Sequence, residues 1–168
     1  MLAISLILLG ILLRLAPHAP NFTPVAAIAL FSGAYLNKKS ALIVPLALMV
    51  LSDFVIGMHN VVLFTWGGFI LITLLGKWLK NKKTVLGAIS TSLASAFLFY
   101  LISNFGVWLM GWYPHTFKGL LDCYVMALPF LRNFTLATLF YVAIFFGIYE
   151  IAAFAVKDKK LSRALLTI

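Results

Sequence analysis

Long apolar runs separated by short polar stretches dominate this chain. A membrane-spanning helix needs about 20 mainly apolar residues, and fewer where the bilayer thins around it. Six runs approach or exceed that length: Leu2–Ala16, Thr23–Leu36, Ala41–Gly57, Val61–Gly76, Thr84–Met110 and Phe134–Val156. The first two cover only about 20 Å each at 1.5 Å per residue, so one broken or re-entrant element is the alternative for them.

A further apolar stretch, Gly119–Leu131, is too short to cross a membrane. One helical face of it carries Leu120, Leu121, Tyr124, Val125 and Leu128. This pattern predicts a helix that lies in the membrane interface or dips inward as a lid, an inert surface helix being the alternative. The predicted fold is all-α and integral to a membrane, with about six transmembrane helices and a short interfacial or re-entrant helix before the last span. We expect residues 1–168 to form a single domain.

The composition agrees with a membrane protein. Apolar residues make up 64% of the chain, charged residues 10%, and the mean hydropathy is +1.09. Soluble domains carry about 25% charged residues, so that class is excluded. The net charge of +9 is scattered between apolar runs and makes no basic face for nucleic acid. One cysteine excludes a disulfide framework.

Lysine and arginine are distributed unequally between the two sides of the predicted membrane protein. Ten of the thirteen fall on one side: Lys38, Lys39, Lys77, Lys80, Lys82, Lys83, Lys157, Lys159, Lys160 and Arg163. Only Arg14, Lys118 and Arg132 fall on the other. Cytoplasmic connections carry the excess of positive charge, so we expect both termini in the cytoplasm.

Polar side chains gather in the connections predicted to lie outside. These are Pro17–Phe22, Met58–Asn60 and Gly111–Asn133, which contain all three histidines. Trp112, Tyr113 and Tyr124 of this set, together with Trp108 at the end of the preceding span, are also typical of an interfacial aromatic belt.

Two polar residues lie within predicted spans, about one turn below the outer surface. Asp53 and Asn104 at that depth normally face the interior of a helix bundle. Asp53 therefore needs a partner, which Arg14, Arg132 or a bound cation would supply; the alternative is a structural ion pair or hydrogen bond.

Asn and Thr precede two of the predicted spans. Asn21-Phe22-Thr23-Pro24 and Asn133-Phe134-Thr135 suit helix starts, with the positive ends of both helices at the outer face. Such ends favour the anionic groups of a substrate. Ala29 and Gly33 in the second span allow close packing, within the chain or against another membrane protein.

Several segments together resemble a known family. They are Arg14-Leu-Ala-Pro-His-Ala-Pro-Asn-Phe-Thr-Pro24, Ala29-Leu-Phe-Ser-Gly-Ala-Tyr-Leu36, Ser52-Asp53, Gly57-Met-His59, Ser103-Asn-Phe-Gly-Val-Trp108, Trp112-Tyr-Pro114, Cys123-Tyr124 and Pro129-Phe130-Leu-Arg-Asn133. Over nearly the whole chain, this set resembles a family of small, uncharacterised bacterial membrane proteins described as transport proteins. The resemblance implies a location in the bacterial cytoplasmic (inner) membrane.

That family is in turn similar to the substrate-binding S components of energy-coupling factor (ECF) transporters. The similarity implies six helices, an outward-facing site under loop lids, and ECF transmembrane and ATPase subunits as partners. S components commonly dock through an alanine-x-x-x-alanine pattern on the first helix, which Leu2–Gly10 lacks; Ala29 and Gly33 are the nearest substitute. The chain has no P-loop, so it carries no ATPase signature of its own.

The leading hypothesis is a membrane transport protein that captures a small nutrient, such as a vitamin or cofactor precursor, on the outer face. Aromatic side chains would stack on a flat ring and Arg132 or helix ends would hold an anionic group. The candidate substrate-binding residues are Asn21, Asp53, His59, Asn104, Trp108, Trp112, Tyr113, His115, Asp122, Cys123, Tyr124, Arg132 and Asn133.

Three alternatives remain at this stage. His18, His59, His115 and Cys123 are candidate ligands for a metal or a corrinoid carried as substrate, although no resident cofactor is expected. An integral-membrane enzyme would use His115, Asp122 and Cys123 at the outer face. A structural subunit of a membrane complex would use Glu150, which lies near Lys157, as a contact.

Overall fold

The computed structural model describes residues 2–80 and 84–155. These residues form seven α-helices and no strand. The helices are α1 (Leu2–Leu15), α2 (Val25–Tyr35), α3 (Lys38–Ile56), α4 (Val62–Leu79), α5 (Val85–Leu109), α6 (Phe117–Met126) and α7 (Leu128–Ala155). The prediction of an all-helical chain is therefore confirmed over the described ranges.

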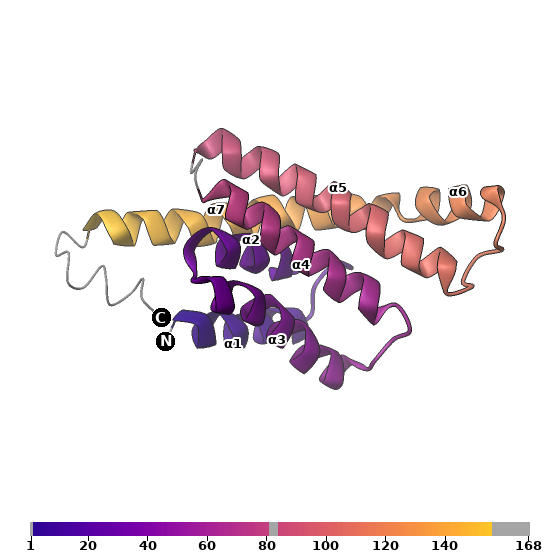
Figure 1. Ribbon diagram of the computed structural model, residues 1–168, viewed down its shortest axis with the longest axis horizontal. Helices are drawn as coiled ribbons and strands as arrows, with labels where there is room; N and C mark the ends of the chain where they lie inside the picture. Colours follow the sequence, from indigo (N-terminus) through magenta and orange to yellow (C-terminus); the bar gives the residue numbers. More distant parts are fainter. Residues whose placement is uncertain (1, 81–83, 156–168) are drawn as a thin grey trace.

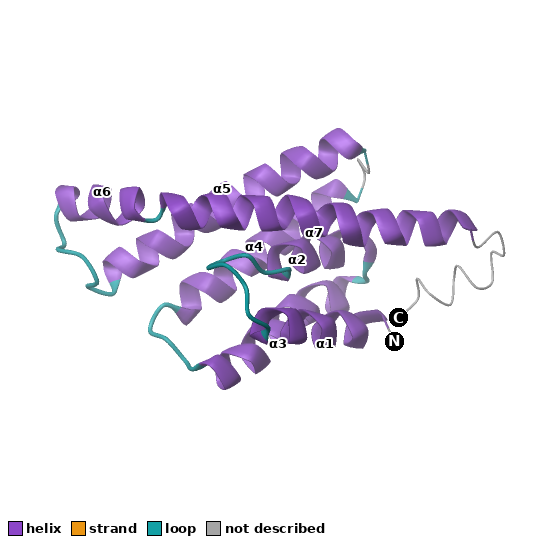
Figure 2. Ribbon diagram, turned by 180° about the vertical axis from the view of Figure 1, so that it is seen from behind, coloured by secondary structure: helices purple, strands orange, loops and turns teal. Residues whose placement is uncertain are grey.

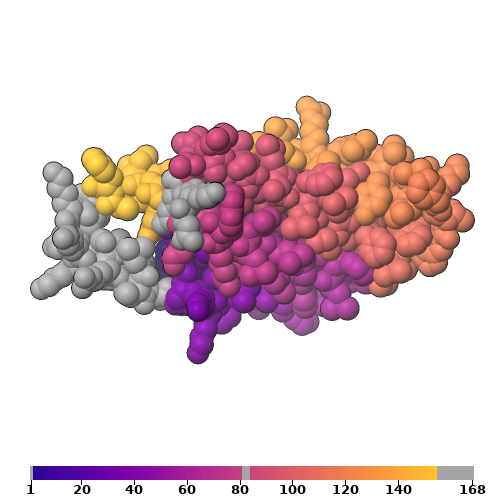
Figure 3. Space-filling view, turned by 45° about the horizontal axis from the view of Figure 1, so that its top comes forward, coloured from indigo at the N-terminus to yellow at the C-terminus, as the bar shows by residue number. Residues whose placement is uncertain are grey.

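Six of these helices run alternately in opposite directions between two ends of the molecule (Figures 1 and 2). The connections 16–24, 57–61 and 110–116 lie at one end, which we call the loop end. The start of α1, the α2–α3 connection and the end of α7 lie at the other, the terminal end. α6 is additional to this alternation and extends the loop end. Figure 3 shows α6 at one extreme of the molecular surface and the last turns of α7 near the other.

Helix α2 is the centre of the packing. Every residue from Val25 to Tyr35 is buried, because its sequence is apolar or small around the whole circumference. At its crossing with α4 the two backbones nearly touch. A Cβ on Gly33 would lie 2.1 Å from the Thr73 carbonyl oxygen, and one on Gly76 would lie 2.3 Å from the Leu30 carbonyl oxygen. Ala29 and Gly33 thus pack inside the chain, and α2 offers no free surface for docking a partner.

Four helices of the described chain are long and apolar enough to cross a membrane: α3, α4, α5 and α7. α1 has 14 residues and α2 has 11, or about 21 and 17 Å, against a hydrocarbon core of about 30 Å. The last four predicted spans are present as the long helices α3, α4, α5 and α7. The first two predicted spans are shorter than a complete crossing, so only four of the six meet the length requirement.

The outer surface of the bundle is strongly apolar. Leu63, Leu86 and Phe154 are 76%, 75% and 84% exposed. A soluble monomer rarely exposes such large apolar side chains in continuous patches, whereas lipid solvates them. The described surface is therefore that of a protein able to lie in a membrane.

Helix α7 begins earlier than the sequence pattern predicts. It starts at Leu128 instead of Phe134, because Pro129 fits the first turn of a helix and the apolar pattern continues through it. Arg132 and Asn133 consequently lie on the helix. The prediction of a helix start at Asn133 is wrong, and so is a capping role for Asn21, since Pro24 occupies the N-cap of α2 without a side-chain cap.

The lysines on described residues agree with the predicted charge separation. Lys38 and Lys39 begin α3, and Lys77 and Lys80 end α4, all at the terminal end. Arg14 and Lys118 lie at the loop end. Arg132 also lies at the loop end, in the first turns of α7 and next to Asn133, which contacts the 16–24 connection. The other six cationic residues of the prediction, Lys82, Lys83, Lys157, Lys159, Lys160 and Arg163, lie outside the described residues.

Candidate functional site

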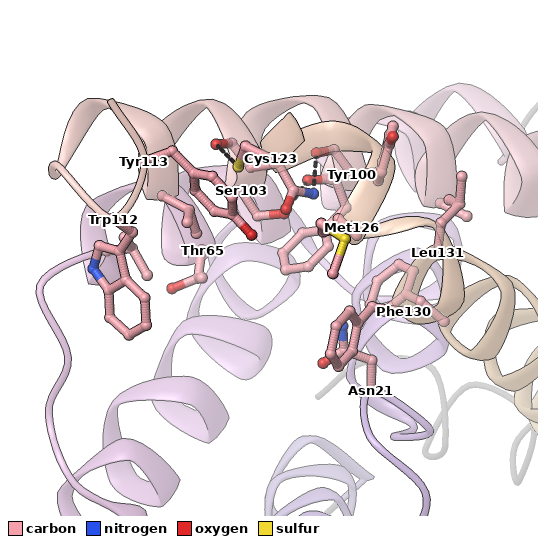
Figure 4. A pocket seen from close by; sticks show the side chains of 17 residues that line it. Asn21, Thr65, Tyr100, Ser103, Trp112, Tyr113, Cys123, Met126, Phe130 and Leu131 are labelled. Atoms are coloured by element: carbon pink, nitrogen blue, oxygen red, sulfur yellow. Dashed lines mark hydrogen bonds between the residues drawn. The ribbon is translucent and has the colours of Figure 1, made fainter. Parts of the chain in front are cut away.

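A cavity of about 400 Å³ lies at the loop end, between α4, α5, α6 and α7 (Figure 4). Its volume falls within the range of small-molecule sites. Its lining consists mainly of aromatic and aliphatic side chains: Asn21, Val61, Thr65, Ala96, Phe99, Tyr100, Ser103, Asn104, Val107, Trp112, Tyr113, Cys123, Met126, Ala127, Phe130, Leu131 and Phe134. No charged side chain belongs to this described lining, so the cavity favours an uncharged ligand.

Helix α6 closes one side of the cavity through a face of small residues. Gly119, Cys123 and Ala127 are buried, at intervals of four residues. Gly119 is required there, because a Cβ would lie 2.1 Å from the Pro114 carbonyl oxygen. The hydroxyl of Thr116 caps the helix by accepting a hydrogen bond from the Gly119 amide at 3.0 Å.

The large apolar side chains that share one face of this segment are mostly exposed. Leu121, Val125 and Leu128 are 48%, 59% and 50% exposed, while Gly119 packs against the Pro114 carbonyl and Cys123 contacts Asn104 of α5. Close backbone approach explains this choice, because small side chains let α6 lie against α5 and leave the large apolar ones for lipid. Lys118 and Asp122 form an ion pair at 3.2 Å on the exposed side.

Tyrosine hydroxyls fasten α6 to α5 at the cavity wall. Tyr100 donates to the Tyr124 carbonyl oxygen, and Tyr124 donates to the Leu101 carbonyl oxygen, both at 2.7 Å. The two rings lie 5.3 Å apart in an edge-to-face arrangement. This reciprocal pair holds the helix rigidly enough to form a wall.

A few polar groups in the cavity are available to a ligand. Asn104 donates its amide to the Tyr100 carbonyl oxygen at 2.8 Å, which leaves its Oδ1 without a partner among the described residues. Within the same ranges, the side chains of Asn21 and Tyr113 form no hydrogen bond. Figure 4 shows Asn21 and Tyr113 on different sides of the opening. Together these groups offer a few oriented contacts in an apolar site, the usual basis of ligand specificity.

Cys123 lines this cavity as a buried, inert thiol. Its Sγ donates to the Asn104 carbonyl oxygen at 3.4 Å, and burial raises the pKa of the thiol above its usual range. A raised pKa keeps the sulfur protonated at neutral pH and lowers its nucleophilicity.

His115, Asp122 and Cys123, the residues that an enzyme would use, each contact a different partner. The His115 Nε2 contacts the Trp108 carbonyl oxygen at 3.0 Å, and Asp122 pairs with Lys118. No hydrogen bond joins His115, Asp122 and Cys123 to one another in the described chain. This geometry supplies no base for the thiol.

Asp53 pairs with Arg14, one of the three partners that the sequence left open. Its Oδ1 lies 2.6 Å from a guanidinium nitrogen of Arg14, and its Oδ2 accepts a hydrogen bond from the Trp66 indole at 2.8 Å. Arg14 also donates to the Ser52 hydroxyl. This cluster, which we call the Arg14–Asp53 cluster, ties α1, α3 and α4 together and lies apart from the cavity lining.

The other candidate residues are placed around the loop end. Trp108 donates its indole N–H to the Pro114 carbonyl oxygen at 3.0 Å, which holds the 110–116 connection. Asn133 donates to the Pro20 carbonyl oxygen at 3.0 Å and joins α7 to the 16–24 connection. Arg132 is exposed and does not line the cavity. Of the predicted binding residues, the cavity brings together Asn21, Asn104, Trp112, Tyr113 and Cys123.

The candidate metal ligands do not converge. No three His, Cys, Asp or Glu side chains of the described residues gather closely enough to hold a metal ion. The His18 ring contacts the Arg14 carbonyl oxygen at 3.0 Å, whereas His115 contacts Trp108 and Cys123 contacts Asn104. The Nδ1 of His59 is buried and has no hydrogen-bond partner in the described structure.

Sequence reasoning missed most of the apolar lining. Phe99, Tyr100, Ser103 and Val107 recur with Asn104 at intervals of three and four residues on α5, and form one helical stripe. That spacing was visible in the sequence, but Phe and Val on such a stripe are equally typical of ordinary helix packing.

The fold and the cavity together define a class: a helical protein with four helices able to cross a membrane and a ligand-sized apolar cavity at one end. Within that class, the chain belongs to the family described as a family of unknown function (DUF6580), whose model matches residues 1–161. Neither a curated protein nor a solved structure matches the chain.

Proposed function

We propose that this chain is a membrane transport protein that captures a small nutrient at its loop end. The cavity of about 400 Å³ is the observation that carries the proposal. Its lining includes the rings of Phe99, Tyr100, Trp112 and Tyr113, which suit a flat ring system, with free amide and hydroxyl groups at its rim. An uncharged vitamin or cofactor precursor fits this chemistry.

The cavity lining does not support the anionic ligand group that the sequence suggested. Arg132 lies outside the lining and Asn133 lies within α7, so neither a guanidinium nor a second helix start supports an anionic ligand. The start of α2 does lie at the loop end, but its first residue, Val25, is buried. We therefore favour neutral ligands.

The distribution of charge supports an orientation. Lys38, Lys39, Lys77 and Lys80 lie at the terminal end, and the positive-inside rule places such an end in the cytoplasm. The loop end, with its cavity, then faces outward from a bacterial inner membrane. Nutrient capture requires this orientation.

The similarity to ECF S components motivates a further part of the proposal, namely docking to transmembrane and ATPase subunits. The buried position of Ala29 and Gly33 excludes α2 as the docking surface. Docking would instead use the exposed apolar side chains of other helices, such as Leu8 and Leu12 on α1.

Native mass spectrometry of the protein, purified in mild detergent from its own host, tests the capture function. We expect a small non-lipid molecule that co-purifies with the chain. The Ser103→Leu variant should lose that molecule, because Ser103 lines the cavity and the larger side chain would fill it. Ser90→Leu is the matched control, since Ser90 is exposed on the same helix and does not line the cavity.

Three results of this experiment would contradict the proposal. They are a bound molecule that survives Ser103→Leu, its loss in Ser90→Leu as well, and the presence of lipid or detergent alone. Partner chains in the same spectrum would identify the energy source.

A further inference from the structure

A second cavity, of about 440 Å³, lies toward the terminal end, between the start of α5 and the second half of α7. It opens on the outer surface of the bundle, because Val85, Ile89 and Ala143 of its lining are exposed. The ends of α2 and α4 contribute Tyr35 and Leu79, which are buried. In a membrane, lipid would solvate this apolar surface. We call this hollow the terminal groove.

Small residues on two helices keep the terminal groove open. Ala88 and Ser92 lie one turn apart on α5, and Ala143 and Gly147 lie one turn apart on α7. A Cβ on Gly147 would meet no atom within 4 Å, in contrast to Gly33, whose Cβ would meet the backbone of α4. Close packing within the described chain therefore does not explain this glycine. Its missing side chain leaves room for an occupant from outside.

The polar groups of the groove gather at one of its ends. Tyr35, Thr84 and Glu150 lie where α2 ends, where α5 begins and near the last turn of α7, all at the terminal end. The remaining polar residue, Ser92, donates its hydroxyl to the Ala88 carbonyl oxygen at 2.7 Å. An apolar groove with polar groups at the membrane surface matches an amphiphile whose head group lies at that end.

The charge of the groove favours a cationic head group. Glu150 is exposed and is the one charged side chain in the described lining. The Tyr35 hydroxyl donates a hydrogen bond to its Oε1, and no lysine or arginine of residues 2–80 and 84–155 forms an ion pair with it. The rings of Tyr35 and Phe146 also line the groove, with centroids 5.2 Å apart. A carboxylate beside aromatic rings is the chemistry that binds an ammonium group.

The size of the groove favours a lipid over a transmembrane helix as its occupant. One helical turn with its side chains, 10 Å wide and 5.4 Å high, fills about 420 Å³. The groove therefore holds about a single turn, whereas a helix that crosses the membrane has about 20 residues. A hydrocarbon chain is narrow enough to lie along the groove.

We propose that the terminal groove binds a phospholipid with a primary ammonium head group, of the phosphatidylethanolamine type. The ammonium donates a hydrogen bond to the Glu150 carboxylate, and an acyl chain lies along Ala143 and Gly147. A phospholipid with a net negative head group is disfavoured, because the carboxylate repels it. This inference does not depend on nutrient capture, since the groove and the cavity at the loop end share no lining residue.

Native mass spectrometry tests the head-group preference. The purified chain in mild detergent is incubated with equal amounts of phosphatidylethanolamine and phosphatidylglycerol that carry identical acyl chains. We expect about tenfold more bound phosphatidylethanolamine, the effect of one hydrogen bond between charged groups. Glu150→Gln should abolish this preference, because the amide keeps the size of the side chain and removes its charge. Asp122→Asn is the matched control, since that exposed carboxylate lies outside the groove, and it should keep the preference.

A second pair of variants tests the site of the acyl chain. Gly147→Leu places a large side chain in the groove and should remove the bound phosphatidylethanolamine. Gly67→Leu is the matched control: a Cβ there also meets no atom within 4 Å, but Gly67 lines neither the groove nor the cavity at the loop end. Ala143→Leu fills the same groove and replaces Gly147→Leu if that variant does not fold.

Four results would overturn the inference. They are equal binding of the two lipids to the unaltered chain, a preference that survives Glu150→Gln, lipid binding unchanged in Gly147→Leu, and a co-purifying protein chain that Gly147→Leu removes. The last result would identify a partner helix as the occupant. Ser103→Leu should leave the bound phosphatidylethanolamine unchanged, so failure of nutrient capture and failure of lipid binding are measured separately.

Discussion

At the scale of single residues, Asp53 shows how a buried charge is accommodated. Both of its carboxylate oxygens have partners, Arg14 on one and the Trp66 indole on the other. The side chains of Arg14 and Asp53 are 15% and 1% exposed. Because desolvation of either charge alone is costly, the cluster contributes stability only as a complete set.

Asp53→Asn should therefore destabilise the protein strongly, by about 3–5 kcal/mol, since it leaves the Arg14 guanidinium without its counter-charge. The double variant Arg14→Met, Asp53→Leu should lose less. Asp122→Asn is the control, because it removes an exposed ion pair worth about 0–1 kcal/mol. Thermal unfolding in detergent measures all three. A loss for Asp53→Asn no larger than that for Asp122→Asn would contradict the role given to the cluster.

Cys123 carries a second prediction at this scale. Burial raises the pKa of its thiol, so the thiolate form becomes populated only above the usual thiol range. Labelling by N-ethylmaleimide should thus be slow at neutral pH and increase as the pH rises past that range. Mass spectrometry over a pH series measures the rate, with a denatured sample as reference. A labelling rate at neutral pH equal to that of the denatured protein would show that the thiol is neither buried nor protonated.

At the scale of elements, the crossing of α2 and α4 determines how the bundle closes. Gly33 and Gly76 let two backbones approach within a distance that no side chain permits. The sequence shows the glycines and the small residues around them. The sequence does not show that other helices surround α2, because an apolar helix has the same residue pattern whether lipid or protein covers it.

Gly76→Ala should destabilise the protein by about 1–3 kcal/mol, because the new methyl group meets the Leu30 backbone and the helices must separate. Gly67→Ala is the matched control on the same helix. Nothing lies within 4 Å of a Cβ at Gly67, so this change should leave stability unchanged or raise it by about 0.5–1 kcal/mol through helix propensity. Thermal unfolding of the two variants compares them directly. Equal effects would show that α2 and α4 do not cross at these glycines.

At the scale of the whole molecule, opposite ends carry opposite character. The terminal end holds the described lysines of α3 and α4, and the loop end holds the cavity under α6. If the loop end faces outward, a membrane-impermeant amine reagent should label Lys118 in right-side-out vesicles, since that side chain is 87% exposed. Lys39 should be labelled only in inverted vesicles. The reverse pattern would overturn the proposed orientation.

The apolar runs and their polar boundaries were sufficient to predict an all-helical chain with helices apolar enough to cross a membrane, and to group the connections 16–24, 57–61 and 110–116 at one end. Lipid forces every backbone group in a span to bond within its own helix, so run length translates directly into helices. The choice of contacts required the tertiary structure. Asp53 had two arginines and a cation as possible partners, and only the packing of α1 against α3 selects Arg14. The cavity, likewise, exists because facing stripes of α5 and α7 meet with α6 above them, and no local pattern encodes which helix faces which.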